Sequence, residues 1–436
     1  MYYFITSLVV IIFSRAISGS WRKTILLPWV ILTTPMLIGA GLANLLLVPF
    51  LISPWSLNTH AVVILGTVAL GISSFTLKKV HGPLWTSSKN ISWNETTLVR
   101  ILLLITFVAV AANALQFIIA GKIPLFSADP DHARIEAAKN GYLHVFSALP
   151  GHIIPIVTLI LATGENLKTR TRRILIAIMV ASFIMLSLWI ARGMLLYPIL
   201  TSIAIMYLLD QRSFGVKKLV LVVSVLVFIV AGIKYIRDSA RFGGTFTTTQ
   251  KQLVSSDMRN MMLLGPAVSL YLSTALNYEI LNRYVQAVPS LAPHTYGRLT
   301  ASHLLAFIPG TGRPYSELDY QNTILKKSEY DFTLTSTFLG APYLEFGMTG
   351  VVIFSCIIGW LYKTVWLGMQ RNGSPWTVFL YGYLISMAAF IPYAFIYCEV
   401  SFIWFILTTF PIIYLCQCRV CNTSVFYNKS RIVFRL

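Results

Sequence analysis

The feature that most constrains this chain is a series of long apolar segments that recur along most of its length. A helix needs about 20 mainly apolar residues to cross the hydrocarbon of a bilayer. Eight such segments precede residue 233 and three follow residue 345. They predict an all-α polytopic membrane protein with about 11 transmembrane helices. The predicted spans are Tyr2–Ile17, Ile25–Ile52, His60–Leu77, Leu98–Ala120, Tyr142–Thr163, Ile174–Ile190, Met194–Leu209, Leu219–Gly232, Phe346–Tyr362, Trp376–Tyr397 and Val400–Cys416.

Composition agrees with this prediction and excludes an ordinary soluble domain. Apolar residues make up 56% of the chain and charged residues 11%, whereas a soluble domain has about 45–50% and about 25%. The first apolar segment has no positive region before it and no small-residue cleavage site after it. We therefore expect a retained helix rather than a signal peptide.

The distribution of Lys and Arg predicts the orientation. The loops on one face of the predicted helices hold 20 of the 34 basic residues and only three of the 15 acids. The loops on the opposite face hold the remainder. Basic residues concentrate in cytoplasmic loops, so we expect a periplasmic N-terminus and a cytoplasmic C-terminus. The net charge of +19 is then a signal of topology rather than of nucleic-acid binding.

The predicted spans divide the chain into four parts. Residues 1–233 carry eight helices, 234–345 form a large periplasmic loop, 346–418 carry three helices, and 419–436 form a cytoplasmic tail. Within the loop, Met261–Ile280 is apolar enough for a twelfth span. A full crossing there would reverse the charge pattern of the last three helices, so we expect an interfacial or re-entrant helix.

Motifs for nucleotides and metals are missing from the sequence. It contains no Walker loop, no dinucleotide fingerprint and no HExxH motif. Cys416, Cys418 and Cys421 have no fourth ligand nearby, and His144 and His152 are more typical of intramembrane hydrogen bonding than of a metal site. We therefore expect no metal and no cofactor.

Arginines recur on the predicted periplasmic face. Arg192 lies in the tight turn Ala191–Gly193 between two apolar helices. One interpretation is an anchor whose charge reaches the interface. The other is a ligand for a lipid-linked diphosphate, which a guanidinium binds through two parallel hydrogen bonds. The remaining arginines considered for that role are Arg134, Arg237, Arg241, Arg298 and Arg313.

The segment Phe307–Tyr315 combines rigid turns with Arg313 and aromatic rings, including Tyr315. Sugars are bound by ring faces together with a few convergent polar groups. This segment, with the acids that follow it, therefore indicates a glycan site in the periplasmic loop.

Several short motifs occur in a fixed order between Ala133 and Glu399. They are Ala133-Arg134, Asn140–Leu143, the Arg192-Gly193 turn, Phe307–Pro309 followed by Gly312–Pro314, Thr337–Gly340, Glu345–Gly347 with Gly350, and Glu399. With this order and topology the chain resembles the O-antigen polymerases, the Wzy-type polymerases of oligosaccharide repeat units in the bacterial inner membrane.

The resemblance implies a metal-independent glycosyltransferase that joins undecaprenyl-diphosphate-linked oligosaccharides on the periplasmic face. It also implies a chain-length regulator as a partner. For the base at the acceptor hydroxyl we predict Glu399 first, followed by Glu345, Asp319 and His303. Glu399 could instead be a water-exposed acid at a helix end, and Glu345 could cap a helix.

Two other functions stay open at this stage. An O-antigen ligase would transfer finished glycan to lipid A-core, and His294 or His303 could serve as its base. A flippase or transporter usually carries charges deep within its helices, and most of the predicted spans lack them. The polymerase is therefore the favoured interpretation.

Overall fold

The computed structural model describes residues 2–46, 53–76, 93–127, 130–138, 141–189, 192–209, 265–305, 308, 335–372, 374–394, 397 and 400–416. Helices account for the regular structure of these residues. In chain order they are α1 (Tyr2–Ser18), α2 (Trp21–Thr24), α3 (Pro28–Ala43), α4 (Leu57–Ser74), α5 (Glu95–Ala120), η1 (Pro124–Phe126), α6 (Pro130–Ala138), α7 (Gly141–Ser147), α8 (Leu149–Thr163), α9 (Thr169–Leu188), α10 (Arg192–Leu209), α14 (Gly265–Ala287), α15 (Arg298–Leu305), α17 (Gly340–Asn372), α18 (Pro375–Ala388) and α19 (Val400–Cys416).

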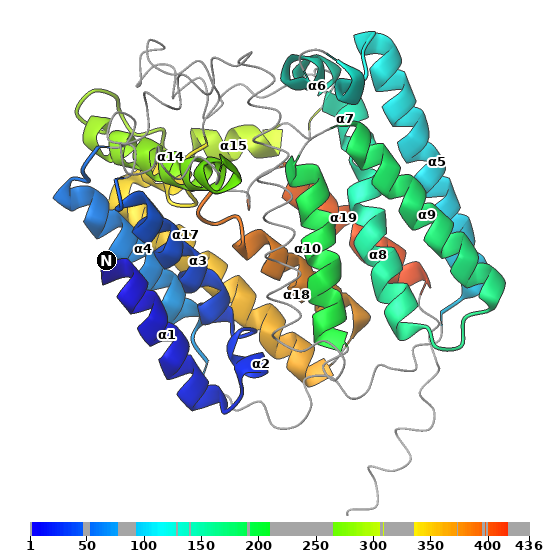
Figure 1. The fold of residues 1–436 in the computed structure, drawn as a ribbon, viewed down its shortest axis with the longest axis horizontal. Helices are drawn as coiled ribbons and strands as arrows, with labels where there is room; N and C mark the ends of the chain where they lie inside the picture. The colour runs from blue at the N-terminus through cyan, green and yellow to red at the C-terminus, as the bar shows by residue number, and fades with distance from the viewer. Residues whose placement is uncertain are drawn as a thin grey trace, which may run out of the picture.

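The long helices form a bundle with two flanks (Figure 1). On one flank α17 packs along α4, and α3 packs on α1 and α4; on the other, α8 packs on α9 and α10. Helix α18 joins the flanks because it contacts both α10 and α17. Helices α6, α14 and α15 lie across one end of the bundle, called here the α15 end (Figure 1).

Hydropathy correctly identified a multi-pass membrane protein. Five helices or helix pairs are long and apolar enough to cross a bilayer: Leu57–Ser74, Glu95–Ala120, Gly141–Thr163, Thr169–Leu188 and Gly340–Arg371. Four more are apolar but shorter, namely Tyr2–Ser18, Pro28–Ala43, Gly193–Leu209 and Phe402–Cys416. The number of eleven spans is not confirmed, and the predicted span Leu219–Gly232 lies outside the described residues.

Two helix boundaries differ from the predicted ones for identifiable reasons. Helix α3 begins at Pro28, in the first turn where a missing N–H does no harm, and ends before Asn44. It is therefore much shorter than the predicted span Ile25–Ile52. Helix α17 begins at Gly340, six residues before the predicted span, and contains a break at Phe346 and Gly347.

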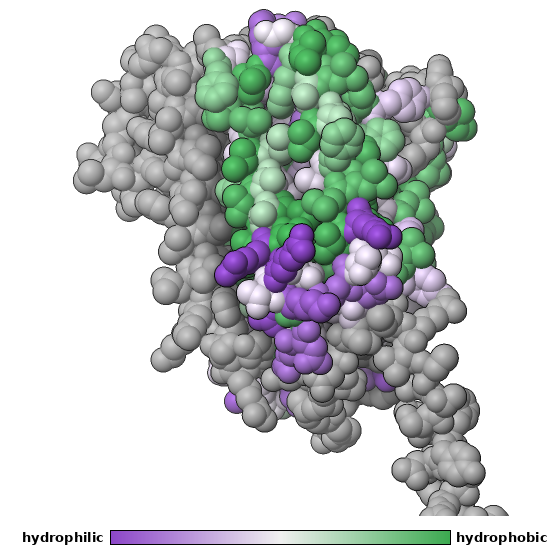
Figure 2. Space-filling view, turned by 90° about the vertical axis from the view of Figure 1, so that its right-hand side faces the viewer, coloured by the Kyte–Doolittle hydropathy of each residue, from purple (hydrophilic) through white to green (hydrophobic). Residues whose placement is uncertain are grey.

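The outward surface of α5 and α9 is hydrocarbon-like. Leu104, Phe107, Ile118 and Ile184 are all more than half exposed, without polar neighbours to cover them. Figure 2 shows this apolar belt, with a hydrophilic band below it where α9 begins. That band includes the exposed residues Lys168, Arg170, Arg172 and Arg173. Such a belt between polar ends is the surface that a bilayer requires.

Helix α14 contains most of the segment predicted to be interfacial or re-entrant. It lies across the ends of the neighbouring helices (Figure 1) and contacts α3, α4 and α17. The hydroxyl of Tyr278 donates to the carbonyl of Met36 at 2.8 Å, and its ring stacks on Trp55 with centroids 5.5 Å apart. Helix α14 therefore closes this end of the bundle instead of adding another parallel span.

Candidate functional site

The break in α17 is the most unusual backbone feature at the α15 end. Phe346 has φ −141° and Gly347 has φ +64° with ψ −146°, a conformation that is essentially restricted to glycine. A Cβ on Gly350 would lie 2.3 Å from the carbonyl oxygen of Pro342. The short segment 340–345 therefore folds back closely against the long part of α17, and glycine at 350 makes that approach possible.

The break leaves backbone carbonyls without helical partners, and a distant segment supplies the donors. The amide of Thr295 donates to the carbonyl of Leu344 at 2.9 Å, and the amide of Tyr296 donates to the carbonyl of Glu345 at 3.1 Å. Carbonyls at a helix end need such partners when they are buried. The two hydrogen bonds hold the loop 294–297, and so the start of α15, against the break.

The side chain of Glu345 strengthens the same junction. It is only 1% exposed, and it accepts hydrogen bonds from the backbone amide of Thr300 at 2.7 Å and from the Thr300 hydroxyl at 2.8 Å. Thr300 lies in the first turn of α15, where free amides and the helix dipole favour a carboxylate. Glu345 thus caps a helix, as one interpretation of the sequence allowed, but the helix is α15 and not its own. Its predicted role as a base stays a prediction.

The imidazole of His294 lies beside these groups. Its Nδ1 is 3.3 Å from the carbonyl oxygen of Leu344. The ring centroid is 6.1 Å from the ring centroids of both Tyr296 and Tyr343. A Cβ on Gly347 would lie 3.3 Å from His294 Cε1, so the glycine leaves one side of the imidazole uncovered.

Aromatic and basic side chains surround this histidine at the surface. Tyr296 is 71% exposed and Phe346 is 42% exposed, with ring centroids 6.5 Å apart. Arg298, the first residue of α15, is also exposed. Exposed rings and an imidazole at one junction, with a basic residue at the start of α15, offer contacts for a sugar, a proton and an anionic group. We call this group the break site; it comprises His294, Tyr296, Arg298, Glu345, Phe346 and Gly347.

A second buried acid, Glu279 on α14, did not stand out in the sequence. It is 2% exposed and accepts from the amide and hydroxyl of Ser53 at 3.0 and 2.9 Å. Arg283 Nε donates at 2.9 Å to Oε1, the same oxygen that accepts from the Ser53 hydroxyl. Asn282 donates to the Ser53 hydroxyl at 3.0 Å and accepts from Thr59 at 2.7 Å. This group, the Glu279 clamp (Ser53, Glu279, Asn282 and Arg283), ties α14 to the start of α4. The i,i+4 spacing of Glu279 and Arg283 is the signal that could have revealed the pair.

The predicted site residues are only partly described by the structure. Arg134 lies half-buried on α6, Arg298 lies exposed at the start of α15, and Arg192 begins α10. Helix α15 also contains His303. The side chains of Arg192 and His303, and the whole of Arg237, Arg241, Arg313, Tyr315, Asp319 and Glu399, lie outside the described residues.

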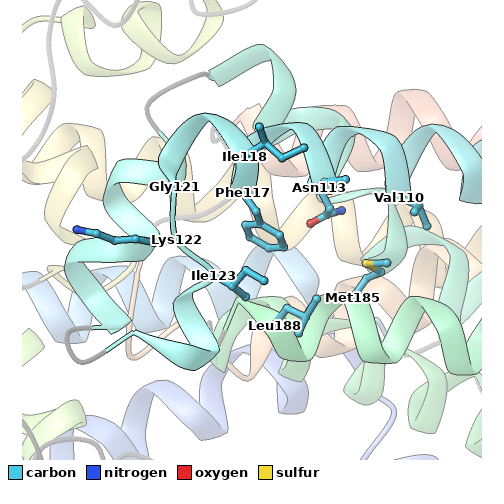
Figure 3. Close-up of a pocket in the computed structure, with 10 residues that line it drawn as sticks. Val110, Asn113, Phe117, Ile118, Gly121, Lys122, Ile123, Met185 and Leu188 are labelled. Carbon is cyan, nitrogen blue, oxygen red and sulfur yellow. The ribbon is translucent and has the colours of Figure 1, made fainter.

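A groove of about 570 Å³ lies elsewhere, between the ends of α5 and α9 (Figure 3). Its walls include Phe117, Met185 and Leu188, and Figure 3 shows the Lys122 ammonium pointing away from them. Asn113 on its floor is fully engaged, since it donates to the carbonyls of Ala109 and Ser147 and accepts from Trp189. These walls offer hydrocarbon contacts but no base and no free polar group for a sugar.

In the part of the chain that the structure describes, no group of three or more His, Cys, Asp or Glu side chains could hold a metal ion. Cys416 is buried, and the two cysteines that follow it lie outside the described residues.

Comparison with known proteins identifies the family. The model of the family described as "Putative O-antigen polymerase" matches residues 2–396. The chain belongs to this O-antigen polymerase family. No curated protein and no solved structure matches the chain. Membership of the O-antigen polymerase family confirms the resemblance and implies a glycosyltransferase-type enzyme that acts on lipid-linked oligosaccharide in a membrane. The match includes the helix break and both segments that pack against it.

Proposed function

We propose that this protein polymerises undecaprenyl-diphosphate-linked repeat units on the periplasmic face of the bacterial inner membrane. The family match over residues 2–396 is the observation that carries the proposal. With the predicted orientation, in which basic loops are cytoplasmic, the α15 end faces the periplasm. The exposed basic residues at the start of α9 then face the cytoplasm. The break site then lies on the face where the lipid-linked glycans are joined.

The reaction needs few protein groups. The acceptor hydroxyl oxygen attacks the first carbon of the growing glycan, and the bond from that carbon to the diphosphate oxygen breaks. The electron pair leaves on the diphosphate, and the hydroxyl proton passes to a base. Diphosphate is a good leaving group, so the site needs positive charge at the departing oxygens. We assign that role to Arg192, with Arg134, Arg298 and Arg313, and expect no metal.

The exposed rings of Tyr296 and Phe346 support a glycan-binding role for the break site. Ring faces that stay at the surface of a protein can pack against the apolar face of a sugar. Arg298, an exposed residue two positions after Tyr296, adds a cation to this end of the bundle. We also expect a chain-length regulator to act together with this protein.

Electrophoresis of surface glycan from a deletion strain tests the proposal. A polymerase predicts that the ladder collapses to core plus a single repeat unit and returns on complementation. Full-length chains left on the carrier lipid would indicate an O-antigen ligase. Loss of even the single unit would indicate translocation, and an unchanged ladder would exclude an O-antigen role.

A further inference from the structure

We propose that His294 is the base that removes the proton from the acceptor hydroxyl. The inference rests on the proposed polymerase function and assigns one step of it to a residue of the break site. In that step His294 Nε2 takes the proton as the hydroxyl oxygen attacks the sugar carbon. The resulting imidazolium then returns the proton to water after the diphosphate has left.

The first argument concerns the tautomer. Nδ1 of His294 lies 3.3 Å from the Leu344 carbonyl oxygen, and a carbonyl oxygen can only accept. Nδ1 therefore carries the hydrogen, and in the neutral imidazole the lone pair is on Nε2. The break in α17 makes this possible, because a carbonyl inside an uninterrupted helix would be bonded to its own helix.

The second argument concerns access to that lone pair. Among the residues that the structure describes, Nε2 has no hydrogen-bond partner, and the side chain is only half-buried. A Cβ on Gly347 would lie 3.4 Å from Nε2. Glycine at this position therefore keeps a side chain from packing against the Cε1–Nε2 edge of the ring.

The third argument concerns the surroundings. The charged and titratable groups that face the imidazole come from the loop, from α15 and from the broken helix. Tyr296 is exposed, Tyr343 is buried, and the Glu345 carboxylate is held by Thr300. Arg298 is exposed and follows in the first turn of α15. The nearby carboxylate is buried and accepts two hydrogen bonds from Thr300, whereas His294 is half-buried and its Nε2 has no hydrogen-bond partner among the described residues.

The other described histidine side chains are placed differently. His60 is bonded to the hydroxyls of Tyr2 and Tyr3, and His152 is bonded to Thr408 inside the bundle. His144 packs its ring against Trp189, with centroids 5.0 Å apart. His132 is an exposed neighbour of Glu136, and it offers a matched control.

Purified protein with lipid-linked repeat units is the system for the test. We would measure turnover against pH for the wild type and for His294→Ala, His294→Gln and His132→Gln. General base catalysis is worth about 10²–10⁴-fold, so we expect that loss of kcat in both His294 variants, with little change in KM. The rise of the wild-type rate with pH should also vanish in these variants. Added imidazole should partly restore His294→Ala, and His132→Gln should behave as the wild type.

Two results would overturn the assignment. One is a His294→Ala turnover within about threefold of the wild type with the same pH profile. The other is full activity in His294→Gln, because glutamine can keep the hydrogen bond to Leu344 but cannot act as the base. Either result, together with a collapsed ladder in the deletion strain, would reject His294 and leave the polymerase function standing. An unchanged ladder in the deletion strain would reject both.

Discussion

Glu279 and Glu345 are both buried carboxylates at the α15 end, but their neighbourhoods differ. Each accepts hydrogen bonds from a backbone amide and from a hydroxyl of one residue, Ser53 or Thr300. Glu279 also has Arg283 at 2.9 Å, so its negative charge is balanced by a cation. In the described part of the chain, no cation lies within ion-pair distance of Glu345, and its junction borders exposed aromatic rings.

We interpret the Glu279 clamp as a scaffold contact and the break site as the proposed reaction site. The Glu279 clamp is closed, because every polar group in it binds another group of the protein. The break site also binds Glu345 firmly, but it leaves the imidazole of His294 with a free acceptor at the surface. We therefore place the proposed base at a group with a free acceptor, while the role of Glu345 as a base stays a prediction.

Glu279→Ala should have the largest effect on stability. It removes the carboxylate that accepts from Arg283 and from Ser53, and breaking a buried ion pair costs about 3–5 kcal/mol. We expect a strong fall in the melting temperature of purified protein and in its abundance in membranes. The control is Glu136→Ala, which removes a more exposed pair with Lys122 worth about 0–1 kcal/mol. Equal melting of the two variants would show that the clamp does not hold α14.

Glu345→Ala and Glu345→Gln distinguish a cap from a base. Hydrogen bonds to a charged group contribute about 1.5–3 kcal/mol each, so alanine should destabilise the protein and abolish polymer. Glutamine can accept from the Thr300 amide and donate to its hydroxyl. We therefore expect Glu345→Gln to make a nearly normal glycan ladder. Loss of polymer in a Glu345→Gln protein of normal stability would support the predicted role as base.

Gly347→Ala should reduce activity more than stability. Strain at such a backbone conformation costs about 1–3 kcal/mol, and the new methyl would press on Cε1 and Nε2 of His294. Gly121→Ala is the matched control, since Gly121 also has positive φ (63°) but nothing within 4 Å of a Cβ. We expect single-turnover rates to fall at least tenfold in Gly347→Ala alone. Similar rates in both variants would argue against a role for the open face.

Ala114→Phe should have the smallest effect. It partly fills the groove between α5 and α9, which has no group for the chemistry. We expect a stability change within about 0.5 kcal/mol and an unaltered ladder. Leu104→Phe, at an exposed position on the same helix, is the control. A shortened ladder in Ala114→Phe alone would show that the groove takes part in binding the lipid carrier.

Much of the bundle could be predicted because its signal is local. Apolar length predicts α5, α9 and α19 within a few residues, since the membrane imposes the same requirement on every span. The start of α17 was missed because Gly340, Pro342 and Glu345 read as a loop before an apolar run. Their helical geometry depends on contacts with residues far away in sequence.

The candidate site was predictable in its parts but not in its assembly. Glu345 and His294 were both considered, yet nothing local shows that one is bound to Thr300 and the other to Leu344. These pairs are 45 and 50 residues apart, so no local pattern in the sequence connects them. The pairing of Glu279 with Ser53 spans 226 residues and is invisible in the same way.

The close approach at Gly350 packs the two parts of α17 together. The Pro342 carbonyl occupies the space of a missing side chain, so segment 340–345 packs directly against the long part of α17. Two further contacts hold this region against α4. Leu339 lies where a side chain on Gly66 would be, and Ser73 lies where a side chain on Gly359 would be. The Leu344 carbonyl that orients His294 belongs to segment 340–345. The position of the imidazole at the α15 end therefore depends on how α17 packs against α4.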